Sequence, residues 1–181
     1  MLARGSGLTT RTLLLCGAFA AVHMLLHVVT VPLLTFLAPV SPPLYGLVAG
    51  VHGIMPFLAR RFTATPGTAT ITAGIAGLFI AVMNVSGILV LIPLLVTGVV
   101  IDLVVWRVDS GASASRRVTT RYLLAAVLAG VALFGVSVSV FSPEHLTPIL
   151  LFATLGTRIA GEMIAATVSG MLVRALDRAG V

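Results

Sequence analysis

Residues 107–121 read RVDSGASASRRVTTR, a polar stretch with four arginines between two long apolar runs. Three further patches of two arginines precede the first apolar run, follow the second run and close the chain: Arg4 and Arg11, Arg60 and Arg61, Arg174 and Arg178. Threading the chain as six membrane spans with the N-terminus inside places all ten arginines on one side. Because arginine concentrates in cytoplasmic loops, the pattern predicts an integral protein of the plasma membrane with both termini in the cytoplasm.

The composition supports a membrane protein. Of the 181 residues, 59% are hydrophobic and 9% are charged, and the mean hydropathy is +1.17. Soluble domains usually carry about 25% charged residues. The net charge of +6 is divided among loops rather than gathered on one surface. We therefore expect contact with anionic lipid headgroups and no nucleic-acid partner.

The apolar runs predict a single all-α transmembrane domain, residues 1–181, built as a bundle of six helices with both ends inside. The predicted spans, in chain order, are about 12–37, 44–59, 68–83, 88–106, 122–141 and 149–172. A helix needs about 20 residues to cross a hydrocarbon core of about 30 Å, and the second and third spans are shorter than that. The outer loops are predicted at 38–43 and 142–148.

Arg158 is the one arginine that falls inside a predicted span, and Glu162 follows it four residues later. The spacing places both side chains on one helix face, with Arg158 about 15 Å from the outer end of the span. Either the pair only neutralises itself and orders the bundle, or Arg158 faces a cavity and binds an acidic or carbonyl group of a ligand. In the second case Glu162 orients the arginine. Ionisable groups inside a membrane favour the functional interpretation.

Three histidines form a second candidate group. His23 and His27 lie four residues apart on the first predicted span, and His52 lies at a similar depth on the second. The three rings are expected to converge, and three imidazoles would suit zinc, nickel, cobalt or copper. No Cys, Asp or Glu accompanies them at ligand spacing, so hydrogen bonds to backbone or ligand contact, particularly by His52, are the other interpretations.

The sequence also suggests roles for three other polar residues. Glu144 and His145 lie in the last outer loop, where they are either solvated or part of a substrate lid. Asp102 is expected to pair with an arginine at the end of the fourth span. The sequence contains no phosphate-binding loop and no HExxH, CxxC or GxSxG motif, so we expect neither an enzyme nor a bound cofactor. Any energy for active transport must come from a partner or an ion gradient.

The combination of six predicted spans, both ends inside, a small-residue face on the first span and no energy-converting motif resembles the S component of an energy-coupling factor (ECF) transporter. Local stretches resemble the Trep_Strep-type S components: residues 53–57 (GIMPF), residues 70–74 (TITAG), Gly98 with Asp102 and Leu103, and the small-residue-rich stretch 161–178. The hydroxymethylpyrimidine/thiamine S components are a second, weaker likeness.

The resemblance implies a subunit that binds a vitamin or other small nutrient in its outer half. Its partners would be a membrane coupling subunit and two cytoplasmic ATPase subunits. The family's A-x-x-x-A docking motif on the first span corresponds here to Gly17 and Ala21, where the match is G-x-x-x-A. The family pattern favours Arg158, Glu162 and the 142–148 loop as the substrate site over the histidines.

Two other functions remain open from the residues. The first is a subunit for uptake of a metal ion or metal chelate that uses His23, His27 and His52. The second is a membrane assembly subunit without a ligand, or an intramembrane enzyme.

Overall fold

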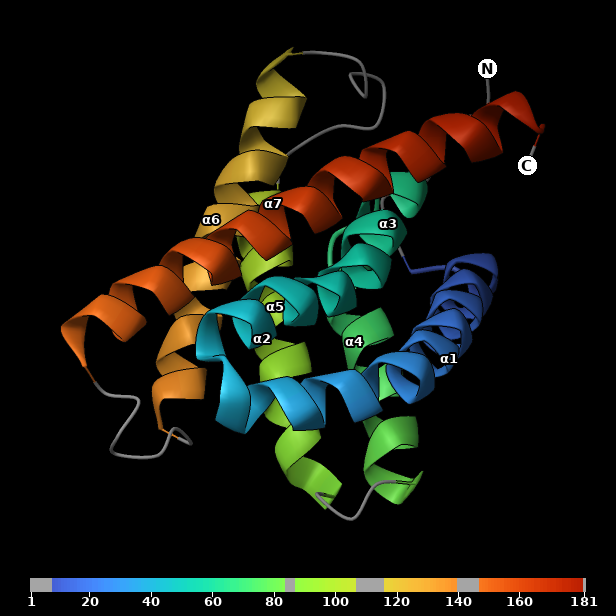
Figure 1. Ribbon diagram of the computed structural model, residues 1–181. Helices are drawn as coiled ribbons and strands as arrows, with labels where there is room; N and C mark the ends of the chain where they lie inside the picture. Colours follow the sequence, from blue (N-terminus) through green and yellow to red (C-terminus); the bar gives the residue numbers. More distant parts are fainter. Residues whose placement is uncertain (1–7, 84–86, 107–115, 140–146, 181) are drawn as a thin grey trace.

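The computed structural model describes residues 8–83, 87–106, 116–139 and 147–180, and helices account for most of these residues (Figure 1). In chain order the helices are α1 (Thr10–Val40), α2 (Pro42–Ala49), η1 (Gly50–Gly53), α3 (Ile54–Thr63), α4 (Thr68–Met83), η2 (Gly87–Val90), α5 (Leu91–Val104), α6 (Arg116–Val138) and α7 (Pro148–Arg178). The short 3₁₀ turn η1 joins α2 to α3, so these three elements form one helical unit.

Within the described ranges, four helical units are long and apolar enough to cross a membrane: Thr10–Val40, Pro42–Thr63, Arg116–Val138 and Pro148–Arg178. The helices α4 and α5 are apolar but shorter, with 16 and 14 residues. The predicted all-helical architecture is therefore confirmed. The count of six crossings and the cytoplasmic position of both ends stay predictions.

The first, second and sixth predicted spans are exceeded at both ends by the helical units Thr10–Val40, Pro42–Thr63 and Pro148–Arg178, whereas α4 coincides with the predicted span 68–83. Most of the expected outer loop 38–43 is therefore helical, and so is the first half of the stretch 60–67. The helix α1 continues through Pro39 to Val40, and α2 begins at Pro42, so Ser41 alone separates them. Proline is favoured in the first turn of a helix, where its missing N–H is not needed. The second predicted span ended at residue 59, yet α3 continues to Thr63.

The unit α2–η1 packs against α7 at very short range (Figure 1). A Cβ atom added to Gly161 of α7 would lie 2.6 Å from the carbonyl oxygen of Leu47, and one added to Gly46 would lie 3.2 Å from the carbonyl oxygen of Thr154. A Cβ atom added to Gly50 would collide with the backbone of Gly161. Small residues let membrane helices approach closely, and here they bring the middle of α7 against η1.

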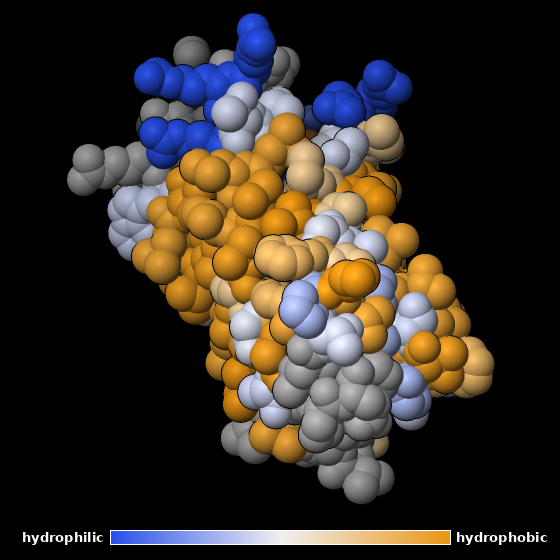
Figure 2. Space-filling view, turned by 60° about the vertical axis from the view of Figure 1, so that its left-hand side comes forward, coloured by the Kyte–Doolittle hydropathy of each residue, from blue (hydrophilic) through white to orange (hydrophobic). Residues whose placement is uncertain are grey.

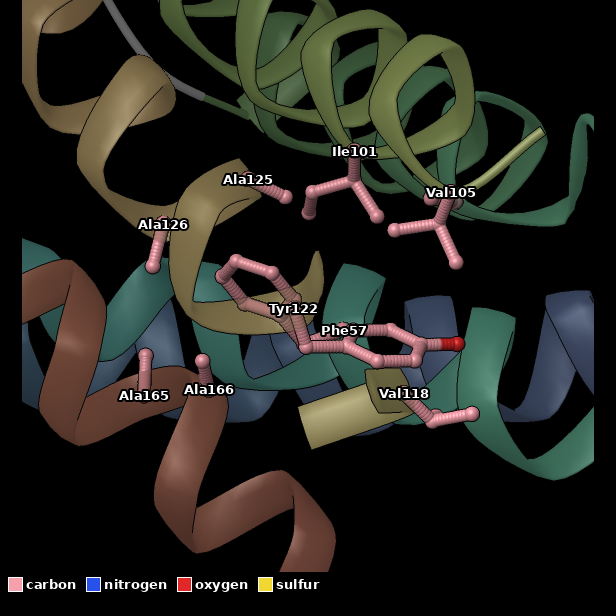
Figure 3. Close-up of a cluster of buried hydrophobic side chains, with 10 residues drawn as sticks. Phe57, Ile101, Val105, Val118, Tyr122, Ala125, Ala126, Ala165 and Ala166 are labelled. Carbon is pink, nitrogen blue, oxygen red and sulfur yellow. The ribbon is translucent and has the colours of Figure 1, made fainter. Parts of the chain in front are cut away.

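The main hydrophobic core lies where α3, α5, α6 and α7 meet (Figure 3). The rings of Phe57 and Tyr122 pack with their centroids 6.4 Å apart. Small side chains of α7, Ala165 and Ala166, pack against the same cluster, which is completed by side chains of α5 and α6. Alanine at these positions allows two aromatic rings to be buried between closely packed helices.

Arg60 is buried at this end of the bundle, with 1% of its surface exposed. Its Nη2 donates a hydrogen bond to the carbonyl oxygen of Val105 (2.7 Å), and its Nε lies 3.5 Å from Oδ1 of Asp102. Oδ2 of Asp102 accepts hydrogen bonds from the backbone N–H (2.8 Å) and the hydroxyl (2.7 Å) of Thr70. The predicted pairing of Asp102 with an arginine is confirmed, and it ties together α3, α4 and α5.

Arg61 joins two more helices to the same end. Its guanidinium lies 3.8 Å from the ring centroid of Tyr122 on α6, and its Nη2 donates to the carbonyl oxygen of Ala166 on α7 (3.2 Å). Helix C-termini favour cations, which explains why both arginines belong to the last turn of α3 instead of a loop. We call this region, defined by Arg60, Arg61, Asp102 and Tyr122, the arginine end.

Hydrophilic residues gather at one end of the molecule, above a broad apolar surface (Figure 2). Much of the exposed apolar surface belongs to α1, where Leu14, Leu25 and Val29 are 70%, 68% and 76% exposed. Exposed aliphatic side chains on this scale are typical of lipid or partner contact. The surface is therefore consistent with a protein embedded in a membrane.

Candidate functional site

A cavity of about 420 Å³ lies at the other end of the bundle from the arginine end. It is enclosed by the C-terminal part of α1, by α2 and η1, by η2 with the first turns of α5, by the last turns of α6, and by α7. The lining residues are His27, Val31, Leu34, Thr35, Ala38, Tyr45, Ala49, His52, Leu89, Val90, Pro93, Leu94, Thr97, Leu133, Val136, Ser137, Arg158 and Glu162.

Arg158 and Glu162 are the charged groups of this lining, and both are buried, at 6% and 1% exposed. Nη2 of Arg158 lies 3.9 Å from Oε1 of Glu162. Charge-assisted hydrogen bonds between such groups are usually about 2.7–2.9 Å long, so the two charges neutralise each other without forming a close bond. Nε and Nη1 of Arg158 and Oε2 of Glu162 have no hydrogen-bond partner among the described residues.

The local sequence creates the space for this pair. Four-residue spacing on α7 places both side chains on the face that packs against η1. A Cβ atom on Gly53 would collide with Oε2 of Glu162, so the glycine leaves room for the carboxylate in its present position. A buried polar atom without a partner costs free energy, and both residues of the pair line the cavity, which makes the pair a candidate for ligand contact.

The three histidines converge, as predicted. Nδ1 of His52 and Nε2 of His23 share a hydrogen bond of 3.3 Å, and Nε2 of His52 lies 3.2 Å from the hydroxyl of Thr30. The rings of His27 and His52 have centroids 5.2 Å apart. Nε2 of His27 is buried and has no partner in the described part of the chain, and His27 and His52 both line the cavity.

The histidine geometry does not favour the metal alternative. Both ring nitrogens of His52 already lie at hydrogen-bond distance from protein groups, namely His23 and Thr30. Within residues 8–83, 87–106, 116–139 and 147–180, no group of three or more His, Cys, Asp or Glu side chains is arranged to hold a metal ion. His23 and His52 instead form a hydrogen-bonded pair, and the ring of His27 packs against His52 at the cavity wall.

Sequence analysis missed the threonine and serine residues of the lining, namely Thr35, Thr97 and Ser137. The hydroxyl of Thr97 donates to the carbonyl oxygen of Pro93 (3.0 Å), and the hydroxyl of Ser137 donates to the carbonyl oxygen of Leu133 (2.8 Å). Each hydroxyl donates its proton to a carbonyl oxygen of its own helix, so the hydroxyl oxygen can still accept a hydrogen bond from a ligand. In the sequence each appears only as a single hydroxyl residue in an apolar run. Such residues are common in membrane helices, so the pattern did not indicate a binding site.

Three of the predicted substrate-binding residues, Arg158, Glu162 and His52, meet in one cavity. Glu144 and His145 lie outside the described residues. The structure thus brings the ion pair and the histidines together as one constellation, although the sequence offered them as rival sites. Whether these groups bind a substrate stays a prediction.

The predicted docking residues lie on α1, away from the cavity. Gly17 is half-buried, and a Cβ atom added there would meet nothing within 4 Å among the described residues. Ala21 is exposed. This part of α1 is open to lipid or to another protein, and the docking role stays a prediction.

No protein-family model matches this sequence. A search of curated proteins also gives no match. A crystal structure of an S component of an ECF transporter does match this fold, with a TM-score of 0.83 and 20% sequence identity. The match covers 97% of this chain and 88% of that one. The chain therefore has the fold of an ECF transporter S component over nearly its whole length.

Proposed function

We propose that this protein is the membrane-embedded substrate-binding subunit of an ECF-type importer for a small nutrient such as a vitamin or a vitamin precursor. The shared fold makes this class of protein the first candidate. Within the class, residues 53–57, 70–74 and 161–178 favour the Trep_Strep-type subunits. A cavity lined by buried polar atoms without partners is the observation that carries the proposal.

The cavity supports a binding role for physical reasons. Ligand sites are usually concave and mostly apolar, with a few convergent polar groups that fix orientation, and have volumes of about 300–1,000 Å³. This cavity has that character, with Arg158 as the donor and Glu162 as the acceptor. Under the proposal, Arg158 binds an acidic or carbonyl group, Glu162 orients the arginine, and His52 forms part of the wall. Glu144 and His145 would approach the ligand from the outer loop.

The partners follow from the proposed class. A membrane coupling subunit would dock on the face of α1 that carries Gly17 and Ala21, and two cytoplasmic ATPase subunits would supply the energy. Both termini and the arginine end would face the cytoplasm, so the cavity would face the outside. The protein itself would have no catalytic role and no cofactor.

Substitution of Arg158 tests the binding role. We expect Arg158→Ala to weaken ligand uptake by cells that express the complete transporter, because the guanidinium can no longer contact the ligand. Arg174→Ala, on an exposed part of the same helix, is the matched control and should leave uptake unchanged. Equal uptake by Arg158→Ala and wild type would contradict the role of Arg158.

Affinity purification from native membranes tests the class of protein. A tagged full-length chain, solubilised in mild detergent, should co-purify with a membrane coupling subunit and two ATPases. Double substitution of Gly17 and Ala21 with leucine should reduce that recovery, because larger side chains prevent close helix approach. A chain that purifies without any ATPase under conditions that preserve a known ECF complex would contradict the proposed function.

A further inference from the structure

The charges of the cavity constrain the ligand it can hold. Among the described lining residues there is one cation, Arg158, and one anion, Glu162, so the ionic lining is neutral overall. A net charge is costly inside a membrane. A ligand with a net charge would leave the occupied cavity charged, whereas a ligand with balanced charges would not. The cavity therefore favours a ligand that is neutral as a whole.

The geometry of the pair requires both signs of charge within that ligand. The 3.9 Å separation of Nη2 and Oε1 leaves Nε, Nη1 and Oε2 without partners among the residues described. Arg158 offers donors, and Glu162 offers an acceptor one helical turn away. A ligand with a carboxylate and an ammonium a few bonds apart can engage both residues at once. A simple acid would satisfy the arginine and leave the glutamate buried beside a second anion.

The apolar side chains of the lining indicate the size and polarity of the rest of the ligand. Val31 and Leu34 of α1, Leu94 of α5 and Leu133 of α6 all line the cavity. These side chains offer dispersion contacts and no hydrogen bonds. The volume of about 420 Å³ lies in the lower part of the range for ligand sites. The ligand body is therefore compact and apolar.

We propose that the cavity binds a compact zwitterion with an apolar side chain, such as an apolar or aromatic amino acid or a close analogue. This inference rests on the proposed function and names the ligand class for the same site. The ligand carboxylate contacts the guanidinium of Arg158, and its ammonium donates to the carboxylate of Glu162. The acceptor oxygens of Thr97 and Ser137 are available for further ammonium protons.

Matched ligand series test the charge requirement. The full chain, reconstituted in lipid nanodiscs, is titrated with leucine, phenylalanine and tryptophan, and with the N-acetyl and methyl ester derivatives of each. We expect at least one parent amino acid to raise the melting temperature. Each blocked derivative of that amino acid should bind about a hundredfold more weakly, because one buried charge is left unpaired. Absence of stabilisation by all three parents, or equal binding of a parent and its N-acetyl form, would overturn the proposal.

A charge-removing variant sharpens the test. Glu162→Gln keeps the size of the side chain and leaves Arg158 as the unpaired charge. We expect its selectivity to invert: the zwitterion binds about a hundredfold more weakly, while the N-acetyl acid binds more tightly than it does to wild type. Unchanged binding of the zwitterion would overturn the proposal. If this variant does not fold, the wild-type ligand series decides alone.

These results separate the ligand class from the proposed function. If the chain co-purifies with the coupling subunit and ATPases but binds only N-acetyl acids, the proposed function is supported and the proposed ligand class is wrong. If the chain binds the zwitterion but no coupling partner co-purifies with it, the ligand class is supported and the proposed function is wrong.

Discussion

The arginine end and the cavity end both bury an arginine beside a carboxylate, yet only the first pair is hydrogen-bonded to other helices by the bonds described above, and only the second lines the cavity. At the arginine end, the carboxylate of Asp102 accepts two hydrogen bonds from Thr70 and pairs with Arg60, which also binds a backbone carbonyl. Both pairs keep buried polar atoms without partners among the described residues, but Arg158 and Glu162 stand 3.9 Å apart and line the cavity. The first pair has the character of a structural joint, and the second of a binding site.

The largest expected effect is at the arginine end. Asp102→Ala removes the partner of buried Arg60 and the oxygen that accepts both hydrogen bonds from Thr70. We expect a loss of about 3–5 kcal/mol in the free energy of unfolding, because a buried charge is left without its partner. Reversible unfolding in mixed micelles measures the change. Asp177→Ala, at an exposed position of α7, should stay within about 0.5 kcal/mol of wild type. Similar losses in both variants would contradict a structural joint at Asp102.

A smaller effect is expected where α7 approaches α2. Gly161→Ala places a Cβ atom 2.6 Å from the carbonyl oxygen of Leu47, so the two helices must separate. We expect a cost of about 1–3 kcal/mol from overpacking, measured by the same unfolding assay, together with weaker ligand binding because the cavity wall shifts.

Gly156 is the matched control for this substitution. It lies on the same helix, and a Cβ atom there would meet nothing within 4 Å among the residues described. Gly156→Ala should leave stability unchanged or raise it by up to about 1 kcal/mol, through the unfolded chain. A larger loss in Gly156→Ala than in Gly161→Ala would show that the contact between α2 and α7 does not set the helix spacing.

The smallest expected effect on stability is at the cavity end. The double variant Arg158→Met with Glu162→Gln removes both charges and keeps the side-chain volumes similar. Replacing a buried ion pair by uncharged residues is often neutral or stabilising by about 1–4 kcal/mol. We therefore expect a folded protein of equal or higher melting temperature that no longer binds ligand. A double variant destabilised as strongly as Asp102→Ala would make the cavity pair a second structural joint.

Particular residues show how far the sequence could predict the site. The four-residue spacing of Arg158 and Glu162 predicted a shared helix face, because helical periodicity is local. The similar depth of His23 and His52 predicted their convergence for the same reason. The relation between the two groups was not predictable, because it depends on which face of α7 packs against η1. Thr97 and Ser137 were missed because a hydroxyl in an apolar helix usually bonds only to its own backbone.

Helix ends were predicted less well than helix positions. The arginines at positions 60 and 61 were expected in a loop, since arginine in a membrane protein marks the cytoplasmic side. Their carbonyl, carboxylate and aromatic partners come from α5, α6 and α7. No pattern along the chain reports partners that lie on distant segments.

The sequence by itself determined that the chain forms apolar helices, that its arginines gather at their ends, and that one ion pair shares a face of the last helix. These properties follow from local periodicity and from the cost of placing charges in an apolar medium. Tertiary structure alone decided which buried arginine is tied to another helix by a hydrogen bond and which lines a cavity. The physical reason is that hydrogen-bond partners and empty volume arise only when helices far apart in the chain pack together, here at distances that glycine permits.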